Sequence, residues 1–185
     1  MENIRAIAID NSKIFPHELA VVIEEKPDFL PNATMVQAEE KRAILYSVED
    51  MLPLSHFGER QGEMSLSAIF TILTGYIRSL MEARNMLLNT AYISSDPEKG
   101  VFISTSETGV RIKVTWGFDT LTDNNEKICR IISELRKRER VMGAASSMER
   151  LMEIVRAGNP SLKNCLAAVE RVNREWNRIE RPAVN

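Results

Sequence analysis

The fold is decided by residues 64–104, which read MSLSAIFTILTGYIRSLMEARNMLLNTAYISSDPEKGVFIS. In the first half of this stretch, apolar side chains recur at steps of three and four residues, the spacing that places them on one face of a helix. They are Leu66, Ile69, Phe70, Leu73, Ile77, Leu80 and Met81. Burial of such a set stabilises a fold by roughly 10–20 kcal/mol before the opposing chain entropy is counted. We therefore predict a core helix, with Ser65 as its N-cap.

The period of the pattern changes after Asn85, from about 3.6 to about two residues, which is typical of extended chain. A DPEKG run at residues 96–100 has the composition of a turn, and the apolar run VFI follows it directly. We therefore predict an elbow over residues 83–89 and then a hairpin. Its two short strands are expected at residues 91–94 and 101–104.

The first 50 or so residues are predicted to form a small antiparallel sheet, because short runs rich in apolar residues are separated by turn-forming residues. The predicted strands are residues 4–9, 19–25, 33–38 and 42–48. Residues 51–54 (MLPL) are then expected to be a linker that leaves the sheet. Residues 55–62 are expected to be a loop ahead of the core helix.

Beyond the hairpin, residues 110–116 alternate between apolar and polar side chains and predict another strand. Three helices follow, each with a sequence signal at its start. The signals are Asp123 with Glu126, Ser146 with Glu149, and Asn159 with Pro160. The chain is thus predicted to be α+β. A small antiparallel β lobe at residues 1–54 precedes a mainly α-helical lobe with a short hairpin at residues 55–185, and the two form one structural unit.

The composition limits the functional classes. The chain has 185 residues and a formal net charge of -2, so overall charge argues against nucleic acid as a partner. Cys129 and Cys165 lie on apolar helical stripes without metal-type spacing, which predicts reduced packing residues. No apolar run approaches the roughly 18 residues that a membrane span needs, and the first residues lack a signal-peptide pattern. We expect a cytoplasmic location.

Three short stretches carry a resemblance to a known family: residues 29–31 (FLP), residues 51–55 (MLPLS), and residues 86–93 (MLLNTAYI) ahead of the DPEKG run. With the order of sheet, linker, long helix, elbow, hairpin and helices, they resemble a degenerate protein-kinase fold. The resemblance is closest to the cytoplasmic pseudokinase-like domain of EssB/YukC, a membrane component of type VII secretion. The stretches also resemble an uncharacterised bacterial family that carries a similar domain ahead of a forkhead-associated module. The resemblance implies a bacterial, pseudokinase-like domain.

The residues that a kinase needs are not matched. Phosphoryl transfer uses a glycine-rich loop, a lysine on the phosphates, a catalytic aspartate, and an asparagine and an aspartate on the metal. The first lobe has no G-x-G-x-x-G, and alignment of residues 42–45 with V-A-I-K puts Leu45 at the lysine. Alignment of residues 91–93 with E-N-I puts Tyr92 at the asparagine and Leu87 at the catalytic aspartate.

The metal-binding aspartate of D-F-G falls at Thr105 or at Thr115, and both alignments remain open. Asp119 is the one nearby acid and is a weak candidate for a relocated metal ligand. The two histidines, His17 and His56, are expected in loops, and G-x-S-x-G, H-E-x-x-H and P-loop sequences are absent. We therefore predict no enzyme, no catalytic residue, no cofactor and no metal.

Two groups of side chains are candidates for binding a partner. A basic cluster at the end of the helix that begins near Asp123 includes Arg136, Lys137, Arg138 and Arg140. It either complements the helix C-terminus or forms a patch for an acidic partner, an anionic membrane surface or RNA. RNA is the least favoured of these, because no aromatic side chains other than Trp116 accompany the cluster. Four aromatic side chains either lie in the core or line a partner groove in a degenerate kinase cleft. They are Tyr76, Tyr92, Phe102 and Trp116, of which Tyr92 and Trp116 are the preferred candidates.

These observations lead to two hypotheses of function. In the first, the chain is a catalytically inactive kinase-like domain that acts as a protein-binding adaptor or assembly scaffold in a bacterial secretion or signalling complex. In the second, it is a sensor that binds a small ligand or nucleotide in a degenerate kinase cleft. The protein partner is not identified by the sequence, and a homodimer is left open.

Overall fold

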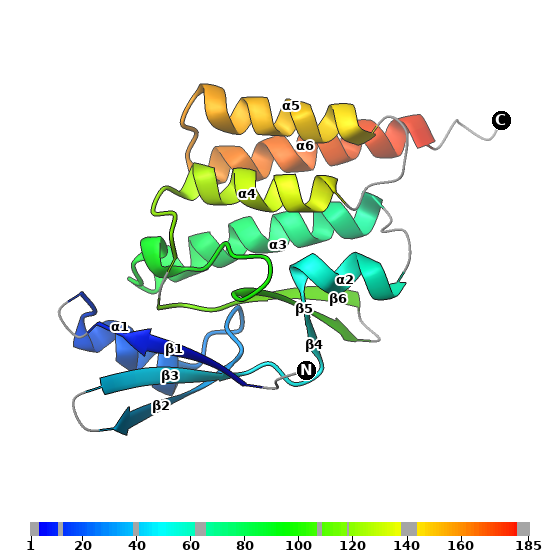
Figure 1. The fold of residues 1–185 in the computed structure, drawn as a ribbon. Coiled ribbons are helices and arrows are strands. Elements are labelled where there is room, and N and C mark those ends of the chain that lie inside the picture. The colour runs from blue at the N-terminus through cyan, green and yellow to red at the C-terminus, as the bar shows by residue number, and fades with distance from the viewer. Residues whose placement is uncertain are drawn as a thin grey trace.

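The computed structural model describes residues 4–10, 13–38, 41–61, 66–106, 109–117, 119–137 and 144–180. Two three-stranded antiparallel sheets lie in the N-terminal half of the chain, and the C-terminal part is mainly helical. In Figure 1 the first sheet lies at the bottom, the second sheet lies above it, and the long helices are stacked over the second sheet. The predicted α+β class, with antiparallel sheet ahead of a mainly helical part, is confirmed.

The first sheet has the strand order β1-β3-β2. Its strands are β1 (Ile4–Ile9), β2 (Asn32–Ala38) and β3 (Lys41–Ser47), each antiparallel to its neighbour. The central strand β3 buries Ile44 and Tyr46 completely, because side chains two residues apart point to the same face of a strand. Three of the four strands predicted for this region are therefore confirmed.

The strand predicted at residues 19–25 is wrong. This segment is helical: α1 (Pro16–Ala20) continues directly into a π-helix, η1 (Val21–Glu25). Pro16 provides a helical φ at the start, and the Glu18 carboxylate accepts the N–H of Phe15. Lys26 then ends the helix in the left-handed region, with φ of 48°. Local hydrogen bonding and burial of Val22 thus override the β-propensity of the Val-Val-Ile run.

The second sheet has the strand order β4-β5-β6. It consists of β4 (Met51–Pro53), β5 (Val101–Ser106) and β6 (Gly109–Val114). The linker predicted at residues 51–54 is wrong, because β4 pairs with β5 some 50 positions later, with Leu52 opposite Ile103. The loop predicted at residues 55–62 is wrong as well, because α2 (Leu54–Gln61) occupies it. The strands β5 and β6 confirm the predictions at residues 101–104 and 110–116.

The predicted core helix is confirmed as α3 (Leu66–Asn85). The apolar side chains predicted to lie on one face are buried, except for Met81, which is half-buried. A Cβ atom at Gly75 would lie 2.7 Å from Cγ2 of Ile112, so the glycine lets α3 approach β6 closely. The predicted cap, Ser65, lies outside the described residues.

The elbow follows α3, and Leu87 turns the chain there with φ of 60°. The strand predicted at residues 91–94 is wrong, because a 3-10 helix, η2 (Thr90–Tyr92), begins directly after Asn89. The Asn89 side chain accepts the N–H of Ala91, and this local cap favours a tight helical turn over extended chain. Only Ile93 makes a β-bridge, to Trp116.

Three helices complete the chain: α4 (Asn124–Arg136), α5 (Ala144–Ala157) and α6 (Leu162–Glu180). Asp123 caps α4 as predicted, since its carboxylate accepts the N–H groups of Asn125 and Glu126. The cap predicted at Ser146 is wrong, because α5 begins two residues earlier. The cap predicted at Asn159 is also wrong. The hydroxyl of Ser161 accepts the N–H of Asn164 at 3.3 Å, so Ser161 caps α6.

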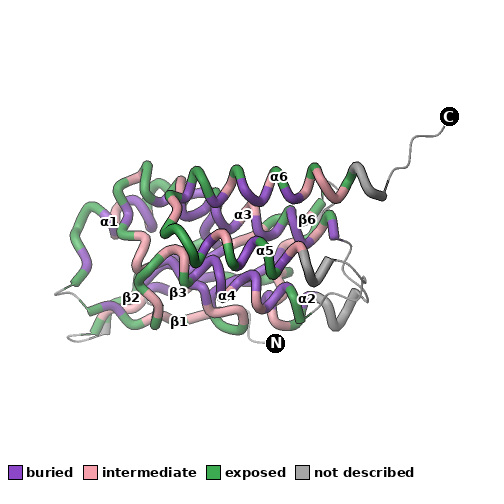
Figure 2. The backbone as a smooth tube through the Cα atoms, turned by 90° about the horizontal axis from the view of Figure 1, so that it is seen from above, coloured by how far each residue is buried: buried purple, intermediate pink, exposed green. Residues whose placement is uncertain are grey.

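The core lies around α3, which packs against β6, α4 and α6. Figure 2 shows buried residues along α3 and alternation of buried and exposed residues along the outer helix α6. The largest fully buried side chains include Trp116, Tyr46 and Tyr76. Within the described residues, no helix is long and apolar enough to cross a membrane.

Candidate functional site

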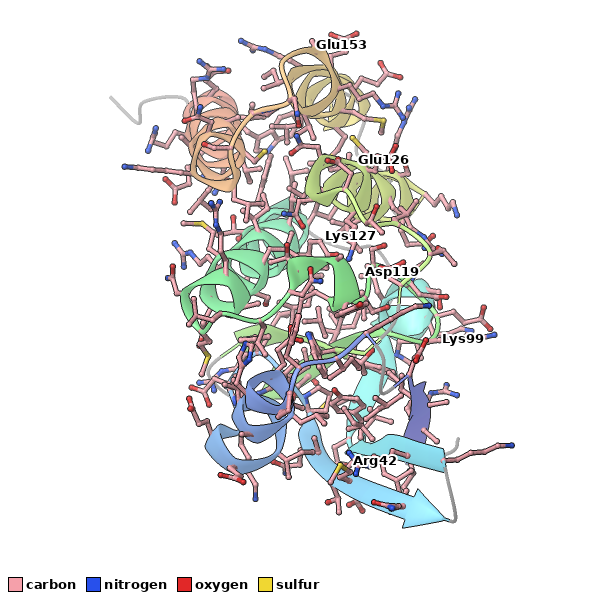
Figure 3. All side chains as sticks on the ribbon, turned by 90° about the vertical axis from the view of Figure 1, so that its left-hand side faces the viewer. Arg42, Lys99, Asp119, Glu126, Lys127 and Glu153 are labelled. Carbon is pink, nitrogen blue, oxygen red and sulfur yellow. The ribbon has the colours of Figure 1, made fainter. Side chains whose placement is uncertain are left out.

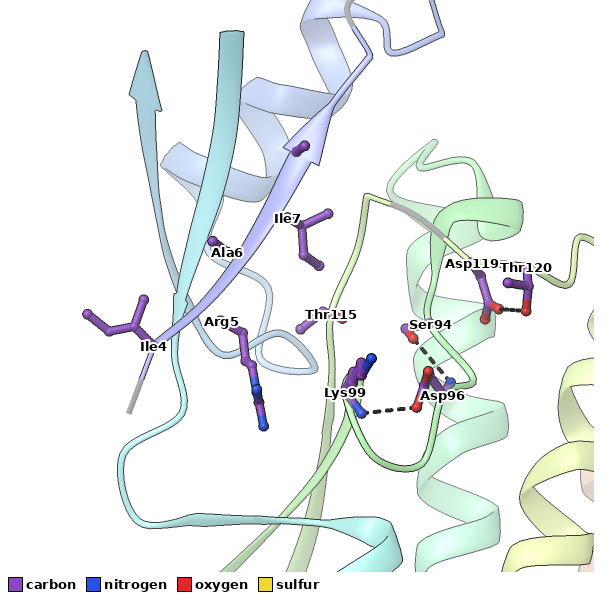
Figure 4. A pocket seen from close by; sticks show the side chains of 11 residues that line it. Ile4, Arg5, Ala6, Ile7, Ser94, Asp96, Lys99, Thr115, Asp119 and Thr120 are labelled. Atoms are coloured by element: carbon purple, nitrogen blue, oxygen red, sulfur yellow. Dashed lines mark hydrogen bonds between the residues drawn. The ribbon is translucent and has the colours of Figure 1, made fainter. Parts of the chain in front are cut away.

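A cavity of about 1130 Å³ lies beside strand β1, and we refer to it as the β1 cavity. One of its walls is β1 itself, through five consecutive residues, 4–8. The opposite wall comes from the segments that flank the second sheet (Figure 4). It consists of Ser94, Asp96, Lys99, Thr115, Asp119 and Thr120. The cavity therefore separates the first sheet from the segments after the elbow.

Asp119 lines this cavity, and its side chain is only 1% exposed. Its carboxylate accepts the N–H groups of Ser95 and Leu121, the latter at 3.1 Å. Arg130 of α4 approaches the same carboxylate at 3.7 Å, and Lys127 approaches it at 3.8 Å. Two backbone donors and two cations thus surround Asp119.

Lys127 is fully buried, which is rare for a lysine. Its Nζ donates to the carbonyl oxygens of Thr90 at 2.9 Å, Ala91 at 2.8 Å, and Ile93. All three acceptors belong to η2 or to the residue after it, so Lys127 holds α4 against the segment that follows the elbow. Burial lowers the pKa of Lys127 from 10.5 to about 8, and the charge of Asp119 partly opposes that change. Figure 3 shows Lys127 and Asp119 together in the interior, with Lys99 farther out.

Asp96 fixes the turn that carries Lys99. One carboxylate oxygen of Asp96 accepts the N–H groups of Glu98 at 2.9 Å and Lys99 at 3.0 Å. The other carboxylate oxygen faces Arg130 at 3.9 Å. A Cβ atom at residue 100 would lie 1.9 Å from Oγ of Ser94, so only glycine fits there. The turn therefore holds the exposed Lys99 at the wall of the cavity.

The contacts of Asp119 concern the prediction that the chain holds no metal. The described residues contain no group of three or more histidine, cysteine, aspartate or glutamate side chains that could hold a metal ion. Asp119, the candidate for a relocated ligand, is engaged by Lys127 and Arg130 instead. The arrangement can bind an uncharged or anionic group, because the cations of the site already offset its carboxylates.

The two aromatic candidates, Tyr92 and Trp116, meet edge to face with ring centroids 5.9 Å apart. Trp116 is fully buried, as are Tyr76 and Phe102, which agrees with the interpretation of these side chains as core. Tyr92 is half-buried, and its hydroxyl donates to the carbonyl of Lys13 at 3.1 Å. The use of Tyr92 and Trp116 as a partner groove stays a prediction.

Tyr46 of β3 joins the two sheets through the backbone of Trp116. Its hydroxyl donates to the Trp116 carbonyl at 2.7 Å and accepts the Trp116 N–H at 3.2 Å. Burial raises the pKa of Tyr46, so the hydroxyl keeps the proton that it donates. The first sheet is therefore fixed to the chain that leaves β6.

The candidate basic cluster is described only in part. Arg136 at the end of α4 forms an ion pair with Glu149 of α5, and Lys137 pairs with Glu134 at 2.8 Å. Arg138 and Arg140 lie outside the described residues, so their grouping with the other two stays a prediction. The described pairs fasten neighbouring turns and helices, which agrees with the structural interpretation of the cluster.

Sequence reasoning missed two buried charged residues, Lys127 and Glu18. Glu18 of α1 is 1% exposed, and its carboxylate accepts the N–H of Asn89 in the elbow at 2.7 Å. Lys127 had a detectable signal, because it lies four residues before Ile131 and thus on the apolar face of α4. Glu18 had no such signal, because this residue lies just before the strand predicted at residues 19–25 and outside every predicted element.

A comparison with models of protein families matched none, and a comparison with curated proteins found no match either.

Proposed function

We propose that this chain is a catalytically inactive kinase-like domain that acts as a protein-binding adaptor or scaffold in a bacterial secretion or signalling complex. The observation that carries this proposal is the set of contacts that the Asp119 carboxylate makes. Asp119 is a buried acid that lines the cavity, and two cations and two backbone N–H groups surround it. A carboxylate held in this way is poorly suited to bind Mg²⁺ or to accept a proton from a substrate.

The order of elements supports the kinase-like part of the proposal. A strand, a helix and two strands precede β4, α2, the long helix α3, the elbow, the β5–β6 hairpin and three helices. Thr115 follows the hairpin and lines the cavity, whereas Thr105 lies within β5 and is exposed. These positions favour Thr115 over Thr105 as the counterpart of the D-F-G aspartate. Threonine cannot replace a metal-binding carboxylate.

The position of α1 helps to identify the strand that corresponds to the V-A-I-K strand of kinases. In kinases that lysine pairs with a glutamate of the helix that follows its strand. Here the strand that precedes α1 is β1, which favours β1 over residues 42–45 as the counterpart. The sequence of β1 is IRAIAI and contains no lysine. Glu18 of α1 accepts the backbone N–H groups of Phe15 and Asn89.

An experiment with two readouts tests this proposal. The purified chain is incubated with radiolabelled ATP, Mg²⁺ or Mn²⁺ and a generic acceptor protein, and the tagged chain is also recovered from its native cells for mass spectrometry. We expect no phosphotransfer and a reproducible protein partner. Phosphotransfer that Asp119→Asn abolishes, or repeated recovery of the chain alone after chemical cross-linking, would contradict the proposal.

A second candidate, a small-ligand sensor, is favoured by the volume of the β1 cavity and by its lining, which is mainly apolar with a few polar groups. A thermal-shift series with nucleotides and other anionic metabolites tests it. A ligand present at about 100 times its Kd should stabilise the chain by about 2.7 kcal/mol. Stabilisation without turnover supports the sensor, and a flat response across the series argues against it.

A further inference from the structure

We propose that the open edge of β1 is a docking site for an extended, acidic segment of a protein partner, which adds as a fourth strand to the first sheet inside the β1 cavity. This inference rests on the proposed adaptor function and specifies where the partner binds. Strand addition of this kind derives its affinity from main-chain hydrogen bonds and its specificity from alternate side chains.

The cavity borders the edge of β1 rather than one face of the sheet. Its lining includes five consecutive residues of β1, 4–8, and consecutive side chains of a strand point to opposite faces. Residues of both faces of β1 thus contribute to the lining, as expected where a cavity lies at the edge of a strand. Within the described residues, β1 pairs with β3 alone, so its other edge has no partner strand. Figure 4 shows β3 on one side of β1 and the cavity on the other.

The edge has few of the features that usually prevent strand addition. Edge strands are commonly protected by charged residues, by proline or by a bulge. In β1, Arg5 is the only charged residue, proline is absent, and the pairing with β3 runs without interruption from Ile4 to Ile9. The side chains of Ile4, Ala6 and Ala8 are exposed. The strand is therefore suited to accept a further strand.

The space beside β1 is long enough for an extended segment of about five residues. Adjacent strands lie about 4.8 Å apart, and five residues of strand span about 16 Å. On the far side of this space stand residues of the same chain, among them Ser94, Lys99 and Thr115. If a second copy of the chain bound through its own β1, its three-stranded sheet would have to enter this space. A single extended segment of a partner brings no such sheet with it. We therefore assign the site to an extended segment and not to a second copy.

The charge of the cavity favours acidic side chains on that segment. The carboxylates of Asp96 and Asp119 are already offset by Arg130 and Lys127. Lys99 stands on the wall opposite β1, is exposed, and forms no salt bridge among the described residues. An acidic residue that faces this wall would meet the Lys99 ammonium directly.

The test begins with selection of linear peptides from a phage-displayed random library on the immobilised full chain. Selected peptides are synthesised, and their Kd values are measured by fluorescence anisotropy. We expect the selected peptides to contain alternating apolar and acidic residues. Methylation of alternate backbone nitrogens of the peptide should abolish binding, because it removes the N–H donors along one edge of the added strand. In hydrogen exchange, β1 amides should gain protection when the peptide binds.

Two pairs of variants locate the site. Ala6→Glu adds an acid to the β1 edge, and Thr34→Glu adds the same acid to an exposed position of the opposite edge strand, β2. Lys99→Glu reverses the cavity charge, and Lys163→Glu makes the same change on an exposed position of α6. We expect about tenfold weaker binding for Ala6→Glu and Lys99→Glu, and less than about twofold change for the two controls.

The remaining outcomes also decide the proposal. No enrichment of peptides, equal binding of N-methylated peptides, or equal effects of Ala6→Glu and Thr34→Glu would overturn it. A concentration-dependent dimer that Ala6→Glu dissociates would assign the edge to a second copy and overturn it as well.

The adaptor function and the edge site can fail separately. If Ala6→Glu still recovers the native partner, the adaptor function stands and the edge site fails. If the wild-type chain recovers no partner but selects peptides for this edge, the adaptor function fails and the edge site stands.

Discussion

The ammonium of Lys127 and the carboxylate of Asp119 lie 3.8 Å apart, with side chains 0% and 1% exposed. Lys127 also donates to three carbonyl oxygens around η2, and Asp119 accepts backbone N–H groups on either side of it in the chain. The pair therefore connects α4, the segment around η2 and the loop after β6. Its hydrogen bonds hold that segment against α4, although the segment has little regular structure.

Replacement of Lys127 by methionine should strongly destabilise the chain. The substitution leaves Asp119 and three carbonyl oxygens without their common partner, and the loss of one member of a buried ion pair costs about 3–5 kcal/mol. Urea denaturation measures the free energy of unfolding. Lys163→Met, on the exposed face of α6, should change it by less than about 0.5 kcal/mol. Equal stability of the two variants would show that the Lys127 contacts contribute little.

The stability of the wild type should rise with pH relative to Lys127→Met. The pKa of Lys127 is lowered from 10.5 to about 8, mainly by burial, so the folded chain holds fewer protons than the unfolded chain between these values. Stability rises with pH wherever the unfolded state binds more protons. At 1.36 kcal/mol per pKa unit, the difference is up to about 3 kcal/mol. Urea denaturation of both proteins from about pH 7 to about pH 10 checks the sign. A constant difference would contradict it.

Gly100→Ala should destabilise the turn at Asp96. The added Cβ atom would lie 1.9 Å from Oγ of Ser94 and 2.4 Å from its Cβ, and overpacking of this kind costs about 1–3 kcal/mol. Gly158→Ala is a matched control, because an added Cβ there meets nothing within 4 Å. Thermal denaturation compares the two. The double variant Gly100→Ala with Ser94→Gly should recover part of the loss, and a failure to do so would assign the loss to backbone conformation.

Glu18→Ala should loosen the contact between α1 and the elbow. The carboxylate of Glu18 is the acceptor for the N–H groups of Phe15 and Asn89, and its removal leaves both donors without it. We expect a loss of about 2–3 kcal/mol and faster hydrogen exchange at the Asn89 amide. Glu18→Gln retains one side-chain oxygen and should lose less. Unchanged exchange at Asn89 in Glu18→Ala would contradict the assigned contact.

Parts of the fold could be predicted from the sequence because the responsible interactions are local. The three- and four-residue spacing of apolar side chains predicted α3, and alternation predicted β6. The carboxylate of Asp123 was correctly placed at the start of α4, since the N–H groups that donate to it lie only two and three residues away. The failure at residues 51–54 has the opposite origin, because pairing of β4 with the distant β5 decides between strand and linker there. At residues 19–25, local hydrogen bonding at the start of α1 and burial of Val22 override the β-propensity of the sequence.

Little of the candidate site could be predicted from the sequence. The residues that line the β1 cavity come from β1 and from segments some 90 to 115 positions later, and no local pattern connects them. Tyr92 and Trp116 were singled out as candidates for a partner groove; their rings are in contact, and Trp116 is a buried core side chain. Lys99 and Lys127 were not singled out, because a lone lysine in a turn or on a helix is usually solvated.

The sequence by itself determined which segments are helical or extended wherever the apolar period is regular, since this is a property of residue identity and spacing. That the residues of phosphoryl transfer are replaced stays a prediction, because it rests on the resemblance to the kinase fold. Only the tertiary structure decided that β1 is an edge strand beside a cavity, that Lys127 is buried on the carbonyl groups of η2, and that Asp119 is enclosed by cations. The physical reason is that periodicity specifies which face of an element is apolar. The partner of that face depends on contacts between residues far apart in the chain.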